Sequence, residues 1–234
     1  MNTLVIMAKH PVTGQVKTRL AESVGETAAA ELATAFLVDL VARLGNCGHR
    51  RVLATWPPGD AAGTFFADLA RNHFELRTQP AGSLGDRLAG VTSEHLGPGN
   101  RVVVIGSDSP TLPEETIEMA FTALDQADVV LSPADDGGYV LIGQRREVPG
   151  LYREIDWSTS RVLNQTRQRL QAAGASYVEL PGWYDIDTLD DLRRLDRELA
   201  SARAECGAGQ GPAPATGHRL DTMPRDWDSR PLSR

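Results

Sequence analysis

The chain has 234 residues, and its 24 lysines and arginines against 31 aspartates and glutamates give a formal net charge of −7. This acidic balance argues against unspecific binding to nucleic acids or to anionic membranes. Hydrophobic residues make up 41% of the chain, and its apolar runs are far shorter than a bilayer span, so we expect no transmembrane helix. No basic segment precedes the first apolar run, and two cysteines are too few for a disulfide scaffold. We therefore predict a cytoplasmic protein.

Segments typical of strands and of helices alternate along most of the chain, which predicts an α/β protein. Short apolar runs predict strands at Thr3–Ala8, Arg51–Trp56, Phe74–Thr78, Arg101–Ile105, Asp128–Ser132, Tyr139–Ile142 and Ser176–Leu180. Apolar residues at helical spacing predict helices at Glu26–Leu44, Ala61–Arg71, Asp86–Glu94, Pro113–Leu124, Ser160–Ala173 and Thr188–Ala202. Because the run at 102–105 is apolar at every position, we expect a mostly parallel central sheet flanked by helices.

The composition changes at the C-terminal end of the chain. Glycines and prolines recur between residues 207 and 217 and interrupt any periodicity. We therefore predict one domain at residues 1–202, followed by a flexible Gly/Pro-rich tail at residues 203–234. As an alternative, Arg225, Trp227 and Arg230 could fold the tail back onto a partner.

The segment after the first predicted strand carries three cations and a glycine. Ligands of open α/β sheets bind where strands end, so this segment is a candidate nucleotide site that contains Ala8, Lys9, Gly14, Lys17 and Arg19. The spacing matches neither the P-loop nor the dinucleotide fingerprint, which argues against an ATPase and against an NAD-dependent enzyme. The alternative is a solvated basic loop.

A second candidate segment for the nucleotide follows the third predicted strand. Gln79 can read a base edge, and Gly82 and Gly85 permit positive φ or a close approach of the backbone to a ligand. Arg87 adds a cation to the same segment. Asp86 can cap the next helix, so the alternative is an ordinary loop followed by a helix cap.

Asp108 is the strongest single indication of a metal. It follows the most apolar strand, beside small residues that leave room for a ligand. A carboxylate at the carboxyl end of a central strand suits Mg²⁺ or Mn²⁺, which prefer oxygen ligands. The alternative is that Asp108 caps the turn into the helix predicted from Pro113.

A fourth segment places Asp135 and Asp136 before Gly137 and Gly138. Adjacent carboxylates before two glycines can bind a cation or the hydroxyl groups of a sugar or acceptor. The alternative is an acidic turn between two strands.

The fifth segment contains Asp185 and Asp187, which alternate as in a strand. We expect one of them to face the site and the other to point away. Thr188 with Asp191 can form a capping box for the last predicted helix.

Together these segments supply cations for a diphosphate and carboxylates for a divalent metal, which fits chemistry on nucleotide diphosphates. The motifs are KHP at 9–11 with GQVKTRL at 14–20, Q at 79 with GSLGDRL at 82–88, GSDSP at 106–110, PADDGGY at 133–139 and DIDT at 185–188. On these motifs the chain resembles, from about Leu4 to Leu199, the GT-A-like transferase family known as arsenosugar-biosynthesis glycosyltransferases or radical-SAM/selenodomain-associated transferases. More distant relatives of that family include phospholactate guanylyltransferase and the molybdenum-cofactor nucleotidyltransferases.

The resemblance implies a GT-A-like fold, as in nucleotide-diphospho-sugar transferases, with a nucleotide bound by the first two segments. It also implies Mg²⁺ or Mn²⁺ at Asp108, with Asp187 or Asp185 as the second carboxylate. A typical GT-A glycosyltransferase has an Asp-x-Asp motif where this chain reads Ser107-Asp108-Ser109. A single aspartate joined by a later one looks more like the arrangement in nucleotidyltransferases.

Three functions follow from this interpretation. The first is glycosyl transfer from a nucleotide sugar to a small-molecule acceptor, with metal at Asp108 and Asp187 and with Lys17 and Asp136 as catalytic residues. The second is nucleotidyl transfer, in which a phosphorylated small molecule attacks a nucleoside triphosphate and pyrophosphate leaves. The third is a nucleotide-binding protein without turnover.

Overall fold

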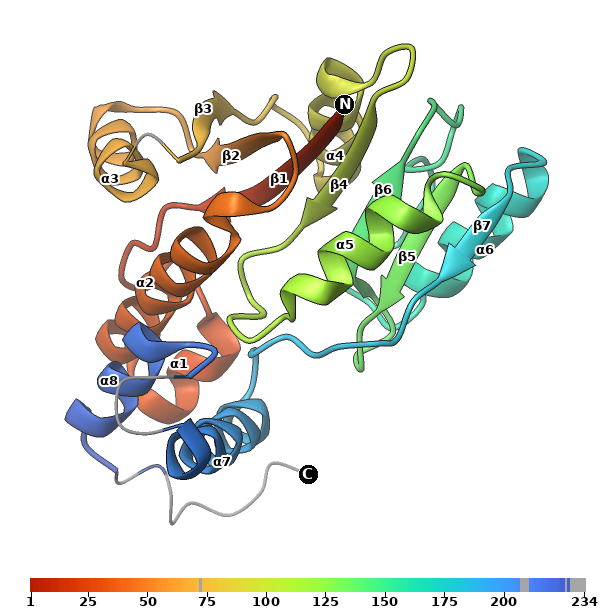
Figure 1. Cartoon of the computed structure of the whole chain (residues 1–234). Helices are drawn as coiled ribbons and strands as arrows, with labels where there is room; N and C mark the ends of the chain where they lie inside the picture. Colours follow the sequence, from red (N-terminus) through yellow and green to blue (C-terminus); the bar gives the residue numbers. More distant parts are fainter. Residues whose placement is uncertain (72, 207–210, 226, 228–234) are drawn as a thin grey trace.

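A computed structural model of the chain describes residues 1–71, 73–206, 211–225 and 227. Its centre is a seven-stranded sheet in the order β3-β2-β1-β4-β6-β5-β7 (Figure 1). Strand β6 runs antiparallel to β4 and β5, and the other neighbouring pairs are parallel. The strands are β1 (Asn2–Lys9), β2 (Arg50–Trp56), β3 (Glu75–Thr78), β4 (Arg101–Ile105), β5 (Val129–Pro133), β6 (Tyr139–Gln144) and β7 (Tyr177–Glu179). The prediction of a mostly parallel α/β sheet is confirmed.

Helices cover both faces of the sheet. They are α1 (Thr18–Val24), α2 (Glu26–Arg43), α3 (Asp60–Ala70), α4 (Leu84–His95), α5 (Glu114–Ala123), α6 (Val162–Ala172), α7 (Leu189–Cys206) and α8 (Pro214–Thr222), with a 3-10 helix at Leu44–Asn46. Leu40 of α2, Phe66 of α3 and Ile117 of α5 belong to one core. Val91 of α4 and Leu170 of α6 belong to another. Within the described residues, every helix is too short or too polar to cross a bilayer.

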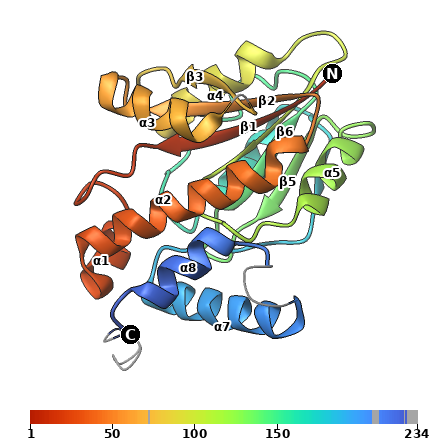
Figure 2. The same cartoon turned by 60° about the vertical axis from the view of Figure 1, so that its left-hand side comes forward.

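A third core joins α1, α2, α7 and α8 beside the sheet (Figure 2). Its fully buried members include Leu20, Phe36, Leu195 and Leu220. The cluster is apolar and includes Leu20 of α1 and Leu189, Leu192, Leu195 and Leu199 of α7, so it anchors the two helices whose first turns follow Lys17 and Asp187.

Helix α1 is not among the helices predicted from the sequence, the first of which is Glu26–Leu44. Of its seven residues only Leu20 is fully buried. A helix of two turns with one core residue has no apolar stripe, and its stability comes from packing rather than from its own sequence. Periodicity therefore does not detect it.

The described part of the C-terminal region differs from the predicted flexible tail. Helix α7 continues to Cys206, and residues 211–225 include α8, which packs on α2. Asp39 of α2 caps α8, because its carboxylate oxygens accept hydrogen bonds from the backbone N–H groups of Ala215 and Thr216, both at 2.8 Å. The cap and its helix are far apart in sequence, so local composition misses the pairing.

Trp227 also folds back, and it does so onto this chain. Its side chain is 1% exposed and belongs to the third core. Arg230 lies outside the described residues.

The strand order determines where a ligand site forms. From β1 the chain moves to β2 and β3, and it then returns to β4 on the other side of β1. The connections after β1 and β4 therefore leave in opposite directions, which opens a crevice at the carboxyl ends of these two strands. Lys17 follows β1 and Asp108 follows β4, so both stand at this crevice.

The cap of α8 gives a prediction for stability. We expect Asp39→Ala to lower the free energy of unfolding by about 1–3 kcal/mol, because two shielded backbone amides lose their acceptor. Urea unfolding followed by circular dichroism measures the change. Asp68→Ala, at an exposed position of α3, is the control and should change the free energy by less than about 0.5 kcal/mol. An unchanged urea midpoint for Asp39→Ala would mean that α8 does not depend on this cap.

Candidate active site

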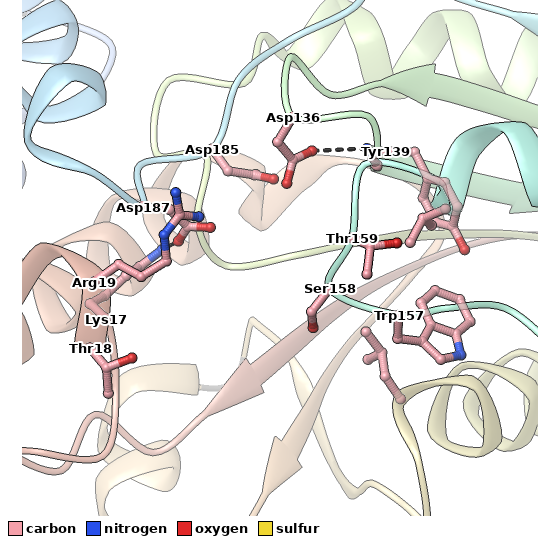
Figure 3. A pocket seen from close by; sticks show the side chains of 13 residues that line it. Lys17, Thr18, Arg19, Asp136, Tyr139, Trp157, Ser158, Thr159, Asp185 and Asp187 are labelled. Atoms are coloured by element: carbon pink, nitrogen blue, oxygen red, sulfur yellow. Dashed lines mark hydrogen bonds and ion pairs between the residues drawn. The ribbon is translucent and has the colours of Figure 1, made fainter. Parts of the chain in front are cut away.

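A cavity of about 420 Å³ lies among α1, the turn between β5 and β6, the loop before α6 and the segment before α7 (Figure 3). One wall is charged and the opposite wall is aromatic, aliphatic and hydroxyl-bearing. The lining residues are Lys17, Thr18, Arg19, Leu84, Asp136, Gly138, Tyr139, Trp157, Ser158, Thr159, Val162, Asp185 and Asp187.

Lys17 joins two of the predicted metal ligands. Its Nζ lies 2.7 Å from Oδ1 of Asp108 and 2.9 Å from Oδ1 of Asp187. The Lys17 side chain is 4% exposed, whereas the two carboxylates are 45% and 40% exposed. Burial by itself lowers the pKa of Lys17, but the charges and hydrogen bonds of the two aspartates more than compensate and raise it above the ordinary value. Lys17 is therefore a charged ammonium between two carboxylates.

Local backbone structure brings these three residues together. Lys17 has φ of 49° and stands directly before α1, so the chain turns sharply there. The backbone N–H of Ile186 donates to the carbonyl of Asp108 at 2.9 Å, which ties the segment before α7 to the loop after β4. The predicted helix cap at Asp108 is not observed, because α5 begins after Pro113 without a side-chain cap.

The start of α7 holds Asp187 in place. Thr188 and Asp191 form the predicted capping box, with Thr188 N–H donating to Asp191 Oδ2 at 2.8 Å and Asp191 N–H donating to Thr188 Oγ1 at 3.3 Å. Asp187 N–H donates to the same Asp191 oxygen at 3.1 Å. The cap thus orients the residue that contacts Lys17.

Asp185 and Asp187 both line the cavity, so the expectation that one of them points away is wrong. Residues two apart in an extended segment lie on the same side of it, and Ile186 between them is fully buried. Ser109 donates its hydroxyl to Asp185 Oδ1 at 2.6 Å. Burial and the nearby charge of Asp108 raise the pKa of Asp185 to about 6. The charged wall therefore holds more carboxylate than Lys17 alone can neutralise.

The acidic turn between β5 and β6 forms the edge of the charged wall. Asp136 lines the cavity, and its Oδ1 accepts a hydrogen bond from Gly138 N–H at 2.9 Å. Gly137 has φ of 89°, and a Cβ there would lie 2.4 Å from the carbonyl oxygen of Ser160. Asp135 instead pairs with Arg194 and lines a smaller adjoining cavity of about 200 Å³. Both glycines thus permit a tight turn that directs Asp136 to the site.

The wall opposite the charges comes from residues that sequence reasoning missed. Tyr139 and Trp157 pack edge to face, with ring centroids 6.5 Å apart. Ser158 has φ of 62°, which a residue other than glycine rarely adopts. A Cβ at Gly85 would lie 2.8 Å from the Trp157 indole nitrogen, so this glycine permits α4 to approach the wall. A loop without strand or motif carries Trp157 and Ser158, and no pattern in the sequence indicates it.

In the described part of the chain, several residues predicted to bind the nucleotide do not line this cavity. These residues are Ala8, Lys9, Gly14, Gln79, Gly82, Gly85 and Arg87. Gln79 is 6% exposed and its amide nitrogen donates to the carbonyls of Ala8 and Ala54, so it links the ends of β1 and β2. Lys9 Nζ donates to the carbonyl of Gln15 at 2.6 Å.

Arg87 and the glycines also have roles within the fold. The Arg87 guanidinium lies 3.8 Å from the centroid of the Trp56 ring and donates to the carbonyl of Gly82. Gly82 and Gly14 have positive φ. Leu84 brings this segment to the cavity, and the capping box of Ser83 and Asp86 begins α4 there. Nucleotide binding by these residues stays a prediction.

The described residues include no cluster of three or more His, Cys, Asp or Glu side chains arranged as a metal site. The donor set nevertheless suits a hard divalent cation, because two carboxylates already converge on one cationic atom, Lys17 Nζ. Mg²⁺ and Mn²⁺ fit these oxygen donors.

Solved structures show which class of protein shares this fold. A protein from Desulfovibrio desulfuricans G20, provisionally assigned as a nucleotide-diphospho-sugar transferase, superimposes with a TM-score of 0.84 at 29% sequence identity, over 94% of each chain. A nucleotidyl transferase from Methanothermobacter thermautotrophicus matches with a TM-score of 0.57 at 14% identity, over 83% of this chain and 95% of that one. CMP:2-keto-3-deoxy-manno-octonic acid synthetase complexed with CTP matches with a TM-score of 0.56 at 12% identity, over 86% and 98%. The fold is that of nucleotide-diphospho-sugar transferases and nucleotidyltransferases.

The chain belongs to the family described as an uncharacterized protein conserved in bacteria (DUF2064), whose model matches residues 40–159. This region contains Asp108 and Asp136, while Lys17 and Asp187 lie outside it. No curated protein matches the chain. The predicted GT-A-like fold is confirmed, and the resemblance to the arsenosugar and phospholactate enzymes stays a prediction.

The pKa of Asp185 gives a second prediction for stability. Because the pKa in the folded chain, about 6, exceeds the ordinary value of 3.8, this carboxyl favours the folded state below about pH 4 and loses that contribution as the pH rises to about 6. We expect Asp185→Asn to raise Tm at pH 7.5, since it removes a cost of about 2–3 kcal/mol, and to raise it much less at pH 4. Differential scanning calorimetry at both pH values measures this, with Asp68→Asn as the control. An equal effect at both pH values would contradict the raised pKa.

Proposed function

We propose that the chain is a metal-dependent transferase that moves a glycosyl group from a nucleotide-diphosphate sugar to a small-molecule acceptor. The observation that carries this proposal is the contact of Lys17 with Asp108 and Asp187, beside a cavity that Lys17 and Asp187 line together with Arg19. Such a wall can hold a diphosphate through its cations and a divalent metal through its carboxylates. The similarity to the D. desulfuricans protein, provisionally assigned as a nucleotide-diphospho-sugar transferase, supports the same substrate class.

In this reaction the bond from the anomeric carbon to the β-phosphate oxygen breaks, and a bond from that carbon to an acceptor hydroxyl oxygen forms. The nucleoside diphosphate leaves with the electron pair, and the charges of Lys17 and Arg19 stabilise it. Asp136 takes the proton of the acceptor hydroxyl. Its hydrogen bond from Gly138 N–H keeps the carboxylate at the cavity wall, and Asp135 with Gly137 completes the turn that orients sugar or acceptor.

Asp108 and Asp187 would hold the Mg²⁺ or Mn²⁺ ion. Both are carboxylates that reach one cationic atom, and oxygen is the donor that these metals prefer. When bound, the metal supplies Lewis-acid stabilisation of the diphosphate charge.

Nucleotidyl transfer is a second candidate, because Ser107-Asp108-Ser109 stands where a typical GT-A glycosyltransferase has Asp-x-Asp. Here a phosphate oxygen of a small molecule attacks the α-phosphate of a nucleoside triphosphate, and pyrophosphate leaves. Lys17 and Arg19 would then hold the leaving pyrophosphate. A nucleotide-binding protein without turnover is the third reading, which predicts binding with no product.

A thermal-shift screen against nucleotide sugars and nucleoside triphosphates, each with Mn²⁺, Mg²⁺ or chelator, separates these functions. At a hundred times its Kd a ligand stabilises a protein by about 2.7 kcal/mol, which for a chain of this size is a rise in Tm of about 5–10 °C. We expect a metal-dependent rise with nucleotide sugars. A rise confined to triphosphates would favour nucleotidyl transfer, and no rise with any ligand would contradict the proposal.

The role of Lys17 is tested on the nucleotide sugar that gives the largest rise. We expect Lys17→Gln to weaken binding of that nucleotide sugar by about 10–100-fold and to leave binding of the parent nucleoside nearly unchanged, because a charged hydrogen bond to phosphate is lost. Isothermal titration calorimetry measures both affinities. Thr18→Ala, which changes a neutral neighbour on the same cavity wall, is the matched control. Equal losses for nucleoside and nucleotide sugar would show that Lys17 holds no phosphate.

A further inference from the structure

The Lys17 ammonium stands where the two predicted metal ligands converge. Its Nζ contacts one oxygen of Asp108 and one of Asp187, at 2.7 and 2.9 Å, and only 4% of the side chain is exposed. A metal ion bound by the same two oxygens would lie closer to each of them than Lys17 Nζ does, because bonds from these metals to oxygen are shorter than 2.7 Å. Lys17 Nζ and a metal therefore cannot occupy this point together.

The charges around this point also do not balance. Two carboxylates share one ammonium, and Asp185 adds a third acidic group to the same cavity wall. Arg19 lines the wall too, but among the described residues no ion pair joins it to Asp108 or Asp187. A divalent cation would neutralise the two carboxylates more fully than the single charge of Lys17 does, provided that the displaced ammonium binds another anion.

A phosphate group would supply that anion. The lysine side chain is a flexible stem with a compact charge at its end, so it can exchange one partner for another. Lys17, Thr18 and Arg19 line the same side of the cavity, so an anion bound in the cavity would lie against the segment that carries the ammonium (Figure 3).

We propose that Lys17 is a built-in counter-ion that occupies the metal position until a nucleotide phosphate draws it away, so that metal and nucleotide bind cooperatively. This inference rests on the proposed function for the nucleotide, but the competition between Lys17 and the metal does not. By linkage, a nucleotide that strengthens metal binding must itself bind more tightly in the presence of the metal, by the same factor.

The competition is measured without nucleotide, by titrating the full chain with Mn²⁺ and following free Mn²⁺ by electron paramagnetic resonance. We expect Lys17→Gln to bind Mn²⁺ at least about tenfold more tightly than the unmodified chain, because it removes the competing cation and leaves both carboxylates unpaired. Arg19→Gln is the matched control, because it removes a cation from the same wall without freeing either carboxylate. It should change the Mn²⁺ affinity by less than about threefold.

A double variant checks that the gain arises at these carboxylates. Adding Asp108→Asn to Lys17→Gln should return the Mn²⁺ affinity to that of the unmodified chain or below it. Circular dichroism and Tm of each variant establish that it is folded, and Lys17→Met serves if Lys17→Gln does not fold. An affinity of folded Lys17→Gln or Lys17→Met that equals or falls below that of the unmodified chain would overturn the proposal. So would a gain that survives Asp108→Asn.

A second titration, with the nucleotide sugar selected by thermal shift, tests the cooperativity. The unmodified chain should bind Mn²⁺ at least about fivefold more tightly when the nucleotide sugar is present, and Lys17→Gln should lose most of this coupling. Absence of coupling in the unmodified chain would overturn the cooperative part. If no nucleotide binds at all while Lys17→Gln still gains Mn²⁺ affinity, the proposed function fails and the counter-ion role stands. If nucleotide sugars bind and Lys17→Gln gains nothing, the counter-ion role fails alone.

Discussion

The ion pairs of Lys17 with Asp108 and Asp187 are the interaction on which the site depends. They join three segments that are remote in sequence, namely the entry to α1, the loop after β4 and the entry to α7. A buried charge is tolerated only when it is paired, so the buried Lys17 ammonium requires the two half-exposed carboxylates. Asp185 nearby has a pKa of about 6, raised by burial and by Asp108, which shows that negative charge on this wall is costly.

The remainder of the fold keeps these segments in register. The strand order opens a crevice between β1 and β4, and the carbonyl of Asp108 accepts a hydrogen bond from Ile186 across it. The third core packs α1 against α7, with α8 docked on α2 through Asp39. The packing of α7 and α8 thus stabilises the helix starts that follow Lys17 and Asp187, although no described residue of these two helices lines the cavity.

Patterns local in sequence predicted the sheet and the ends of its strands well, which is why they pointed to Lys17 and Asp136, which line the cavity, and to Asp108, which pairs with Lys17. Features that depend on distant contacts were not predictable. The cap of α8 comes from Asp39, 176 residues before Ala215, and Trp157 lines the cavity from a loop without a motif. Gln79 looked like a base-reading residue, yet its amide nitrogen bonds to the ends of β1 and β2. The shared orientation of Asp185 and Asp187 could have been predicted, because side chains two residues apart in an extended segment lie on the same side of it.

The most direct measurement of the central claim is a crystal structure of the chain with Mn²⁺ and a nucleoside diphosphate, recorded at a wavelength where manganese scatters anomalously. We expect the anomalous peak in contact with Asp108 and Asp187, and Lys17 Nζ within hydrogen-bonding distance of a phosphate oxygen. A peak elsewhere, with Lys17 still between the two aspartates, would contradict both the metal site and the exchange of Lys17 from carboxylate to phosphate.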